Sequence, residues 1–313
     1  MTPAADTLHT HPLRRLSVEP GQHPRGAGFL SAASGLVCRH GCAYVIADDE
    51  LHLTVFRDAA SPGQLHRVVA GELPAGRRAR KKQKPDLETL LWWPRARSKT
   101  NGGASLLALG SGSRASRERA VLVVLDAHGE PTSAAPQTID MAPLFTPLRE
   151  RVASLNIEGA FVLGQELVLL NRGLTDGRDN VALHYLLSDV QALIAGSTKA
   201  LPPQQQRRIA LPRIQGVSLT FTDGAALPGD REGRWLFTAV AEDSEDSVAD
   251  GDFLGAAVGL VDAQGTLLAL RPLAPAAKVE GIDVQLSHGQ MHLCLVTDAD
   301  DPEVASMLLR ARW

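Results

Sequence analysis

The strongest constraint on the fold is a unit that recurs five times along the 313-residue chain. Each copy has a polar residue, usually followed by Gly, then two short apolar strands joined by a turn, and a polar cluster at the end of the second strand. The copies begin near Ser34, Glu88, Glu158, Gln215 and Glu280. Their spacing leaves room for four strands per unit, and repeated units of four short strands are typical of the blades of a β-propeller.

Four apolar runs can be followed within a unit. In the second unit they are TLLWW, SLLALGSG, AVLVVLDA and QTIDMAPL, and clusters of Gly, Pro, Asn or Asp separate such runs. This pattern indicates strands rather than helices. Two segments, 144–155 and 188–196, have helical character, and we expect them to be insertions between strands. The absence of βαβ alternation argues against a doubly wound sheet, whereas a two-domain β-sandwich remains an alternative fold.

The ends of the chain suggest how the ring closes. The fifth unit has only three strands before the chain ends at Trp313, and residues 12–20 form an unassigned strand candidate. An N-terminal strand in the outer place of the last blade would cover a sheet edge and join the two termini. We therefore predict an all-β fold, a five-bladed β-propeller whose last blade is closed by the N-terminal strand. It would span residues 11–313 after a flexible segment, residues 1–10.

The repeat places polar residues at one register. In a propeller the first strand of each blade is innermost, so Ser34, Glu88, Glu158, Gln215 and Glu280 are expected to converge on the axis. Three carboxylates held close together either take up protons or bind a cation. Oxygen ligands in a roomy ring suit calcium better than zinc. The alternative is that these side chains bind backbone groups or channel waters.

A second set of polar residues follows the second strands of the units, on the same face. The candidate ligand-binding residues in this set are Asp48, Ser113, Arg114, Asn171, Arg172, Glu242 and Asp298. The segment GSGSR (110–114) can expose amides and hydroxyls to an anion. The basic run RRARKKQK (77–84), with further Arg and Lys residues in nearby loops, suggests a funnel for a phosphorylated ligand. Polar blade rims and a solvated basic loop are the structural alternatives.

Other features exclude several classes of partner. Only 4% of the residues are aromatic and none is interleaved with the basic run, so we do not expect nucleic-acid binding. No apolar stretch is long enough to span a membrane, and the opening residues do not resemble a signal peptide. Three cysteines fit a reducing compartment, and we expect a cytoplasmic protein. A protein partner stays open.

Several motifs together resemble an uncharacterised bacterial propeller family related in style to the esterase-like phytase domains. They are KPDLETL, ALGSGSR, LNIEGA, LLNRG, KVEGID and VTDADDP. The inner-strand register is also similar to that of the calcium-activated nucleotidases, or apyrases, five-bladed propellers with Ser and Glu side chains around an axial calcium ion. This resemblance implies that Ser34, Glu88, Glu158 and Glu280 are calcium ligands. Gln215 departs from the pattern, and the resemblance does not extend to the substrate residues.

Two functions are compatible with these features. One is a calcium-dependent hydrolase of an anionic, phosphorylated small molecule, in which the cation polarises a phosphoryl oxygen and activates water while Arg114 and Arg172 neutralise developing charge. The other is a non-catalytic propeller that binds a ligand or a protein, with a structural ion or a water cluster at its centre. A propeller fold accommodates both.

Overall fold

The fold is built almost entirely of β-strands. The structure, a computed structural model, describes residues 6–94, 104–132, 135–173, 180–243 and 251–313. In these residues the helical elements are three short α-helices and one 3-10 turn. The prediction of an all-β fold is confirmed.

Three four-stranded antiparallel sheets follow one another along the chain, each with its strands in chain order. The first contains β2 (Ala33–Arg39), β3 (Cys42–Ala47), β4 (His52–Phe56) and β5 (Gln64–Arg67). The second contains β6 (Leu87–Trp93), β7 (Ser105–Gly110), β8 (Arg119–Val124) and β9 (Gln137–Asp140). The third contains β10 (Ile157–Leu163), β11 (Glu166–Asn171), β12 (Val181–Leu186) and β13 (Gln205–Arg208).

The rest of the chain forms an eight-stranded sheet and a small hairpin. The order of the large sheet is β16 (Thr220–Ala226), β17 (Trp235–Asp243), β18 (Asp252–Val261), β19 (Leu267–Ala274), β1 (Leu8–Arg15), β22 (Met307–Arg312), β21 (Gln290–Thr297) and β20 (Val279–Ser287). The hairpin is β14 (Arg213–Ile214) with β15 (Val217–Ser218). As predicted, an N-terminal strand pairs with the last strand, β22, but it runs from Leu8 to Arg15 rather than over residues 12–20. It begins at Leu8, so part of the segment that we expected to precede the domain lies in the sheet.

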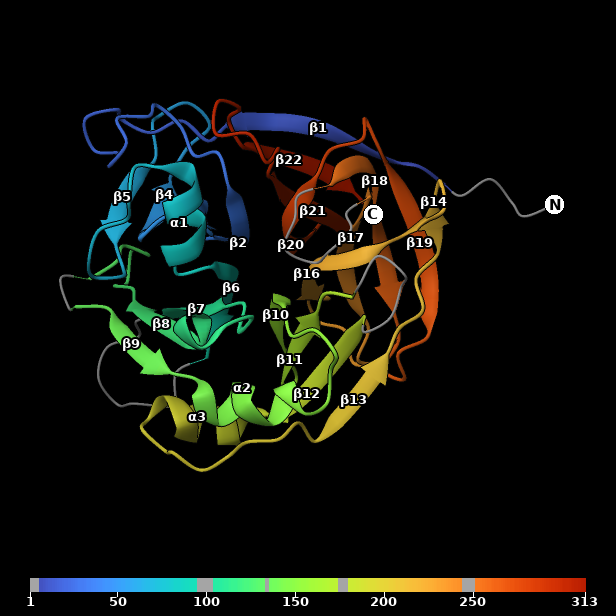
Figure 1. Ribbon diagram of the computed structural model, residues 1–313. Helices are drawn as coiled ribbons and strands as arrows, with labels where there is room; N and C mark the ends of the chain where they lie inside the picture. Colours follow the sequence, from blue (N-terminus) through green and yellow to red (C-terminus); the bar gives the residue numbers. More distant parts are fainter. Residues whose placement is uncertain (1–5, 95–103, 133–134, 174–179, 244–250) are drawn as a thin grey trace.

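The first strands of the sheets enclose the centre of the molecule. Neighbouring strands make contact in the cyclic order β2, β6, β10, β16, β20 and back to β2. Figure 1 shows these strands around the central space, with the later strands of each sheet farther out. This radial arrangement is propeller-like. Apolar side chains fill the wedges between neighbouring sheets; for example, Phe161 of β10 packs against Trp235 of β17.

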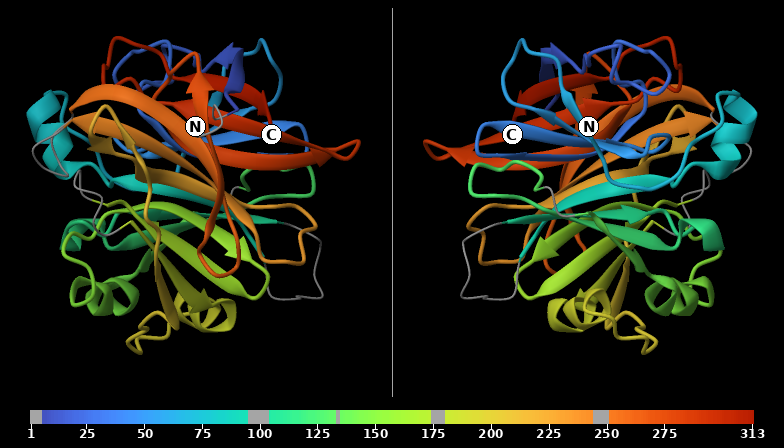
Figure 2. Two further views of the ribbon diagram at one scale, coloured as in Figure 1. Left: turned by 90° about the vertical axis from the view of Figure 1, so that its right-hand side faces the viewer. Right: turned by 90° about the vertical axis from the view of Figure 1, so that its left-hand side faces the viewer.

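The helices lie outside the ring of inner strands. Two of them, α2 (Ala142–Arg149) and α3 (Leu187–Ile194), overlap the two segments predicted to be helical, and their buried residues join the apolar cluster between the second and third sheets. The basic run, for which a solvated loop was the structural alternative, contains α1 (Arg77–Gln83). A 3-10 turn, η1 (Ala115–Arg117), follows β7. In Figure 2, which views the ring from the side, α1 lies at one end of the molecule.

The Gly that follows the polar residue in three inner strands has a steric reason. A Cβ atom on Gly35 would lie 2.6 Å from the backbone N of Leu90 in β6. On Gly159 it would lie 2.9 Å from Cα of Asp223 in β16, and on Gly281 2.8 Å from the carbonyl O of Ser34 in β2. Neighbouring inner strands are therefore too close for a methyl group, which explains the repeated polar-Gly pair.

This contact predicts the effect of one methyl group. Gly159→Ala should lower the free energy of unfolding by about 1–3 kcal/mol, because the backbone of β16 must move to admit the new Cβ. Thermal denaturation should show a midpoint several degrees lower. Gly21→Ala is the control, since its Cβ would have no neighbour within 4 Å. A Gly159→Ala midpoint equal to that of the control would contradict the steric account.

Candidate functional site

Each inner strand carries a β-bulge, and in four of the five the bulge lies at the polar residue that the repeat predicts. The pairing with the next strand shifts by one residue in all of them. The residues skipped by the register are Ser34, Glu88, Glu158, Thr222 and Glu280. A bulge re-aims the side chain of its extra residue. All of these except Thr222 line one cavity of about 350 Å³, which we call the axial pocket.

The placement expected for Gln215 is wrong. Gln215 is exposed at the turn between β14 and β15, with φ of 50°, and Gly216 follows it with φ of 90°. The polar-Gly pair here serves a tight turn that needs left-handed backbone. The inner strand begins later, at Thr220, and Thr222 occupies its bulge. The Thr222 hydroxyl donates a hydrogen bond to the carbonyl of Val279.

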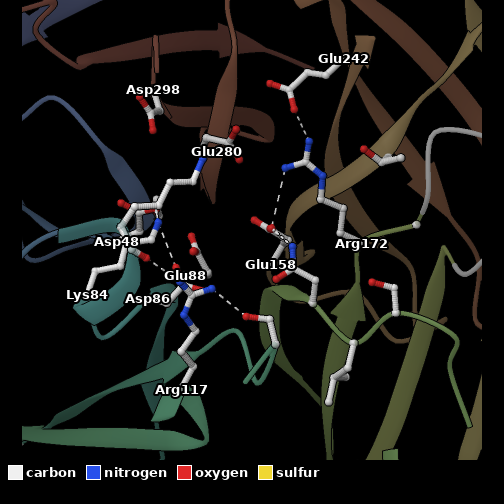
Figure 3. Close-up of a pocket in the computed structure, with 18 of the residues that line it drawn as sticks. Asp48, Lys84, Asp86, Glu88, Arg117, Glu158, Arg172, Glu242, Glu280 and Asp298 are labelled. Atoms are coloured by element: carbon white, nitrogen blue, oxygen red, sulfur yellow. Dashed lines mark hydrogen bonds and ion pairs between the residues drawn. The ribbon is translucent and has the colours of Figure 1, made fainter. Parts of the chain in front are cut away.

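The other predicted residues divide into two groups. Asp48, Ser113, Arg172, Glu242 and Asp298 line the axial pocket together with the bulge residues. Figure 3 shows most of these side chains converging on the pocket from several sheets.

Asn171 and Arg114 do not line it. The buried Asn171 amide instead binds backbone, accepting from the amide N of Asn156 at 2.9 Å and donating to the carbonyl of Ser154. Arg114 is exposed, and Arg117, three residues later, points into the pocket. Of the loop basic residues, Arg95, Arg97, Lys99 and Arg178 lie outside the described part of the chain.

One side of the pocket is organised around Asp86, the residue before β6. Its Oδ2 accepts from the Arg117 guanidinium at 2.8 Å, and its Oδ1 lies 2.9 Å from the Lys84 ammonium. Lys84 also forms an ion pair with Asp48. The Ser111 hydroxyl donates to Asp86 as well. Asp86 thus joins the end of the basic run to the second sheet, with two cations on one carboxylate.

The opposite side is organised around Glu242, at the end of β17. Arg172 forms an ion pair with Glu242 and lies 3.7 Å from Oε1 of Glu158. The Lys278 ammonium lies 2.7 Å from Glu242 Oε1 and 3.5 Å from Glu280 Oε1. These contacts connect the third sheet with the eight-stranded sheet, and each cation is shared between at least two carboxylates.

Burial leaves these carboxyls in different protonation states. It raises the pKa of Glu158 to about 7, and the pKa values of Glu88 and Glu280 rise well above the ordinary range for the same reason. Burial and the Asp48 carboxylate raise the pKa of Asp298 to about 8. Burial acts to raise the pKa of Glu242 as well, but its contacts with Arg172 and Lys278 outweigh it and lower that pKa. At neutral pH the pocket therefore holds both proton donors and ionised acceptors.

The pocket also contains a set of oxygens suited to a metal ion. Asp48, Asp86 and Glu88 each offer a carboxylate oxygen, and these oxygens lie within 4.8 Å of one another. Hard oxygen donors of this kind fit calcium or magnesium. The Lys84 ammonium contacts two of the three carboxylates, so a metal ion would compete with it.

Carboxyl groups outnumber cationic groups in the lining of the pocket. Its described lining includes eight carboxylates and six cationic side chains. The carboxylates are Asp48, Asp86, Glu88, Glu158, Glu242, Glu280, Asp298 and Asp300, and the cations are Lys81, Lys84, Arg117, Arg149, Arg172 and Lys278. The raised pKa values of Glu88, Glu158, Glu280 and Asp298 reduce the negative charge of this set at neutral pH.

Several pocket residues were not among the predicted ligands. Asp86, Asn156 and Lys278 each stand two residues before a bulge Glu and line the pocket with it. A strand repeats every two residues, so this position was accessible from the sequence once the register was known. The contribution of Lys84 was hidden because the basic run has no regular relation to the repeat.

The raised pKa values predict how stability depends on pH. A folded pKa near 7 against an ordinary 4.5 means that the folded protein retains the Glu158 proton between those values while the unfolded chain has lost it. The contribution of this proton to the free energy of unfolding is therefore fully present below about pH 4.5 and is lost as the pH rises through 7. Between pH 5.5 and pH 8, the titration of Glu158 alone should lower the free energy of unfolding by about 2 kcal/mol.

Glu158→Gln removes this titration. Urea unfolding at pH 5.5 and pH 8 should give a smaller pH-dependent loss in the variant than in the wild type. Glu303→Gln is the matched control, because it makes the same chemical change at an exposed position. Equal losses in Glu158→Gln and the wild type would show that this carboxyl does not titrate as the structure requires.

Comparisons with known structures give weak likenesses. Regucalcin from Agrobacterium tumefaciens, a calcium-binding protein, is 10% identical with a TM-score of 0.45, over 99% of this chain and 97% of that chain. PQQ-bound aldose sugar dehydrogenase from Streptomyces coelicolor is 13% identical with a TM-score of 0.45, over 96% and 98%. BBS1N, solved in complex with ARL6DN, is 8% identical with a TM-score of 0.35, over 87% of this chain and 60% of that chain. We take no function from likenesses at this level.

Sequence comparison places the chain in a family. No curated protein matches it. Among the described residues, no helix is both long enough and apolar enough to cross a membrane. None of these comparisons links the chain to phytases or apyrases. A family model matches residues 29–312, and the chain belongs to this family of unknown function, DUF6929.

Proposed function

We propose that the axial pocket binds one divalent cation, with calcium as the best fit, and together with it a small phosphorylated molecule that the protein hydrolyses. The observation that carries the proposal is the cluster of eight carboxyl and six cationic side chains around one cavity, with three carboxyl oxygens within 4.8 Å of one another. Burying many charges is unfavourable for folding compared with an apolar core. Clusters of perturbed titratable groups in a cavity are typical of functional sites.

The proposal places this pocket on the axis of a five-bladed propeller. The eight-stranded sheet then counts as two blades, β16–β19 and β20–β22 with β1. In support, β1 pairs with β22 from Thr10 to Arg15, whereas it meets β19 only at Leu8 and His9. The cyclic contacts of the inner strands agree with this count. In this arrangement each blade contributes its first strand to the axis.

The cation would be held by Asp48, Asp86 and Glu88, with the Ser34 hydroxyl also on the pocket wall. Calcium accepts such oxygen ligands in flexible geometry. Since Lys84 contacts Asp48 and Asp86, its ammonium must leave them when the cation binds. The displaced ammonium would remain at the pocket and become available to a phosphoryl oxygen, so cation binding would prepare the site for an anion.

The remaining roles fall to side chains already in place. A bound divalent cation supplies a Lewis acid and lowers the pKa of a coordinated water. Arg117 and Arg172 present guanidiniums to the cavity, where they would neutralise charge on a phosphoryl group. Arg117 thereby takes the role that the sequence suggested for Arg114. Glu158, with a pKa near 7, can take up or release a proton at neutral pH.

A non-catalytic binding protein is the second candidate. It is favoured by the ion pairs that Lys84, Arg172 and Lys278 already form, since these pairs compensate much of the buried charge without a metal. In that case the central charges would hold the sheets together and the cavity would bind a polar ligand without chemical change. Of the two candidates, only the first predicts that a phosphoester is hydrolysed.

The cation is tested with Asp86→Asn. We expect calcium to raise the thermal midpoint of the wild type and to bind at least tenfold more weakly to the variant, as measured by calorimetry. Asn is a suitable replacement because Asp86 has φ of 56°, and Asn tolerates left-handed backbone. Asp252→Asn, at an exposed carboxylate on β18, is the control. Unaltered midpoints with calcium or chelator would overturn the metal site.

Turnover is tested separately. The purified protein should hydrolyse members of a panel of phosphomonoesters with calcium and lose this activity with chelator. Arg172→Lys should keep the positive charge but lose the guanidinium contact geometry, and we expect kcat to fall by about tenfold or more. Calcium binding without hydrolysis of any ester would favour the non-catalytic candidate.

A further inference from the structure

A second cavity of about 540 Å³ adjoins the axial pocket. We call it the side groove; it is lined by residues within segments 25–32, 75–84 and 298–303 and by Asp48 and Asp49. Five residues line both spaces: Asp48, Lys81, Lys84, Asp298 and Asp300. These five side chains lie at the boundary of the two cavities, and a ligand that reaches from the axis into the side groove would pass between them. The two volumes together suit a molecule larger than a phosphate ion.

The walls of the side groove are held by buried contacts. Glu50, only 2% exposed, binds Arg25 at 2.8 Å and Arg80 at 3.2 Å. One carboxylate therefore holds the segments 25–32 and 75–84 together. Ala32 forms a β-bridge with Asp298, which holds the segment 298–303 against the segment 25–32. The side groove is thus formed before any ligand binds, as is usual for small-molecule sites.

The floor of the side groove is partly apolar. Ala27, Phe29, Ala32, Ala75 and Pro302 contribute to its lining. Phe29 is half-buried, and one face of its ring carries the Arg15 guanidinium at 4.5 Å. Such a surface suits a flat or ring-bearing group better than a second phosphate.

The electrostatics of the side groove also disfavour a second anion. Its lining carries six carboxyl and four cationic side chains. Of the cations, Arg25 and Arg80 contact Asp49 and Glu50, and Lys84 contacts Asp48. The lining also includes two exposed carboxylates, Asp301 and Glu303. A negatively charged group in the side groove would meet these carboxylates, whereas a neutral or cationic group would not be repelled.

Building on the proposed function, we infer that the side groove holds the leaving alcohol of the phosphoester, and that this alcohol carries a neutral or cationic ring and no second anionic group. The substrate class is then a phosphomonoester of a ring-bearing alcohol. In its hydrolysis, the bond from phosphorus to the water oxygen forms and the bond from phosphorus to the alcohol oxygen breaks. The alcohol leaves with a proton that originates from the water.

Matched substrates test the inference. Phenyl phosphate is compared with its 4-aminomethyl and 4-carboxy derivatives, which differ in the charge placed in the side groove. We expect kcat/KM to be highest for the aminomethyl ester and lowest for the carboxy ester. The double variant Asp301→Lys with Glu303→Lys should reduce the ratio of these two values at least tenfold. Both positions are exposed, and Glu232→Lys, at a residue 72% exposed, is the control.

A steric variant separates the two spaces. Ala27→Trp should fill the side groove and lower kcat/KM for phenyl phosphate, with little effect on methyl phosphate and on calcium binding. If the esters are hydrolysed but neither the charge reversal nor Ala27→Trp changes the preference among them, the inference is overturned while the proposed function stands.

A binding measurement distinguishes failure of the proposed hydrolysis from failure of the side groove specificity. Calorimetry without calcium uses 4-(aminomethyl)phenol, the alcohol of the preferred ester. Binding that the charge reversal weakens, together with no hydrolysis of any ester, would support the side groove specificity and reject hydrolysis. No binding of this alcohol to the wild type and no hydrolysis would reject both.

Discussion

The close approach of the inner strands is the constraint on which the rest of the molecule depends. Gly35, Gly159 and Gly281 let neighbouring backbones come within the distance that a Cβ would occupy. The preceding residue in each strand lies in a β-bulge, and Ser34, Glu158 and Glu280 all line the same pocket. The geometry that packs the sheets thus also concentrates acidic side chains at the axis.

This concentration of acid explains the cations around it. Isolated carboxylates buried at this depth would be strongly disfavoured, and Lys84, Arg172 and Lys278 each contact at least two carboxylates. The compensation is incomplete because raised pKa values remain at Glu158 and Asp298. The proposed function requires such a site to exchange an internal ammonium for an external cation.

The sequence was informative where chemistry followed the repeat and uninformative where it did not. The strand pattern, the pairing of the N-terminal strand with β22 and the acidic bulge residues were predicted from periodicity. Gln215 was misplaced because the same polar-Gly pattern occurs at a bulge and in a tight turn, and only the tertiary fold distinguishes the two. Arg114 and Arg117 lie three residues apart around η1, so sequence alone could not decide which side chain enters the pocket.

A crystal structure of the protein grown with calcium tests the central claim most directly. The account predicts one ion among the carboxylate oxygens of Asp48, Asp86 and Glu88, at 2.3–2.6 Å as calcium requires. It also predicts that the Lys84 ammonium has moved away from Asp48 and Asp86. A map with no ion at the axis, and with Lys84 still in contact with both carboxylates, would contradict it.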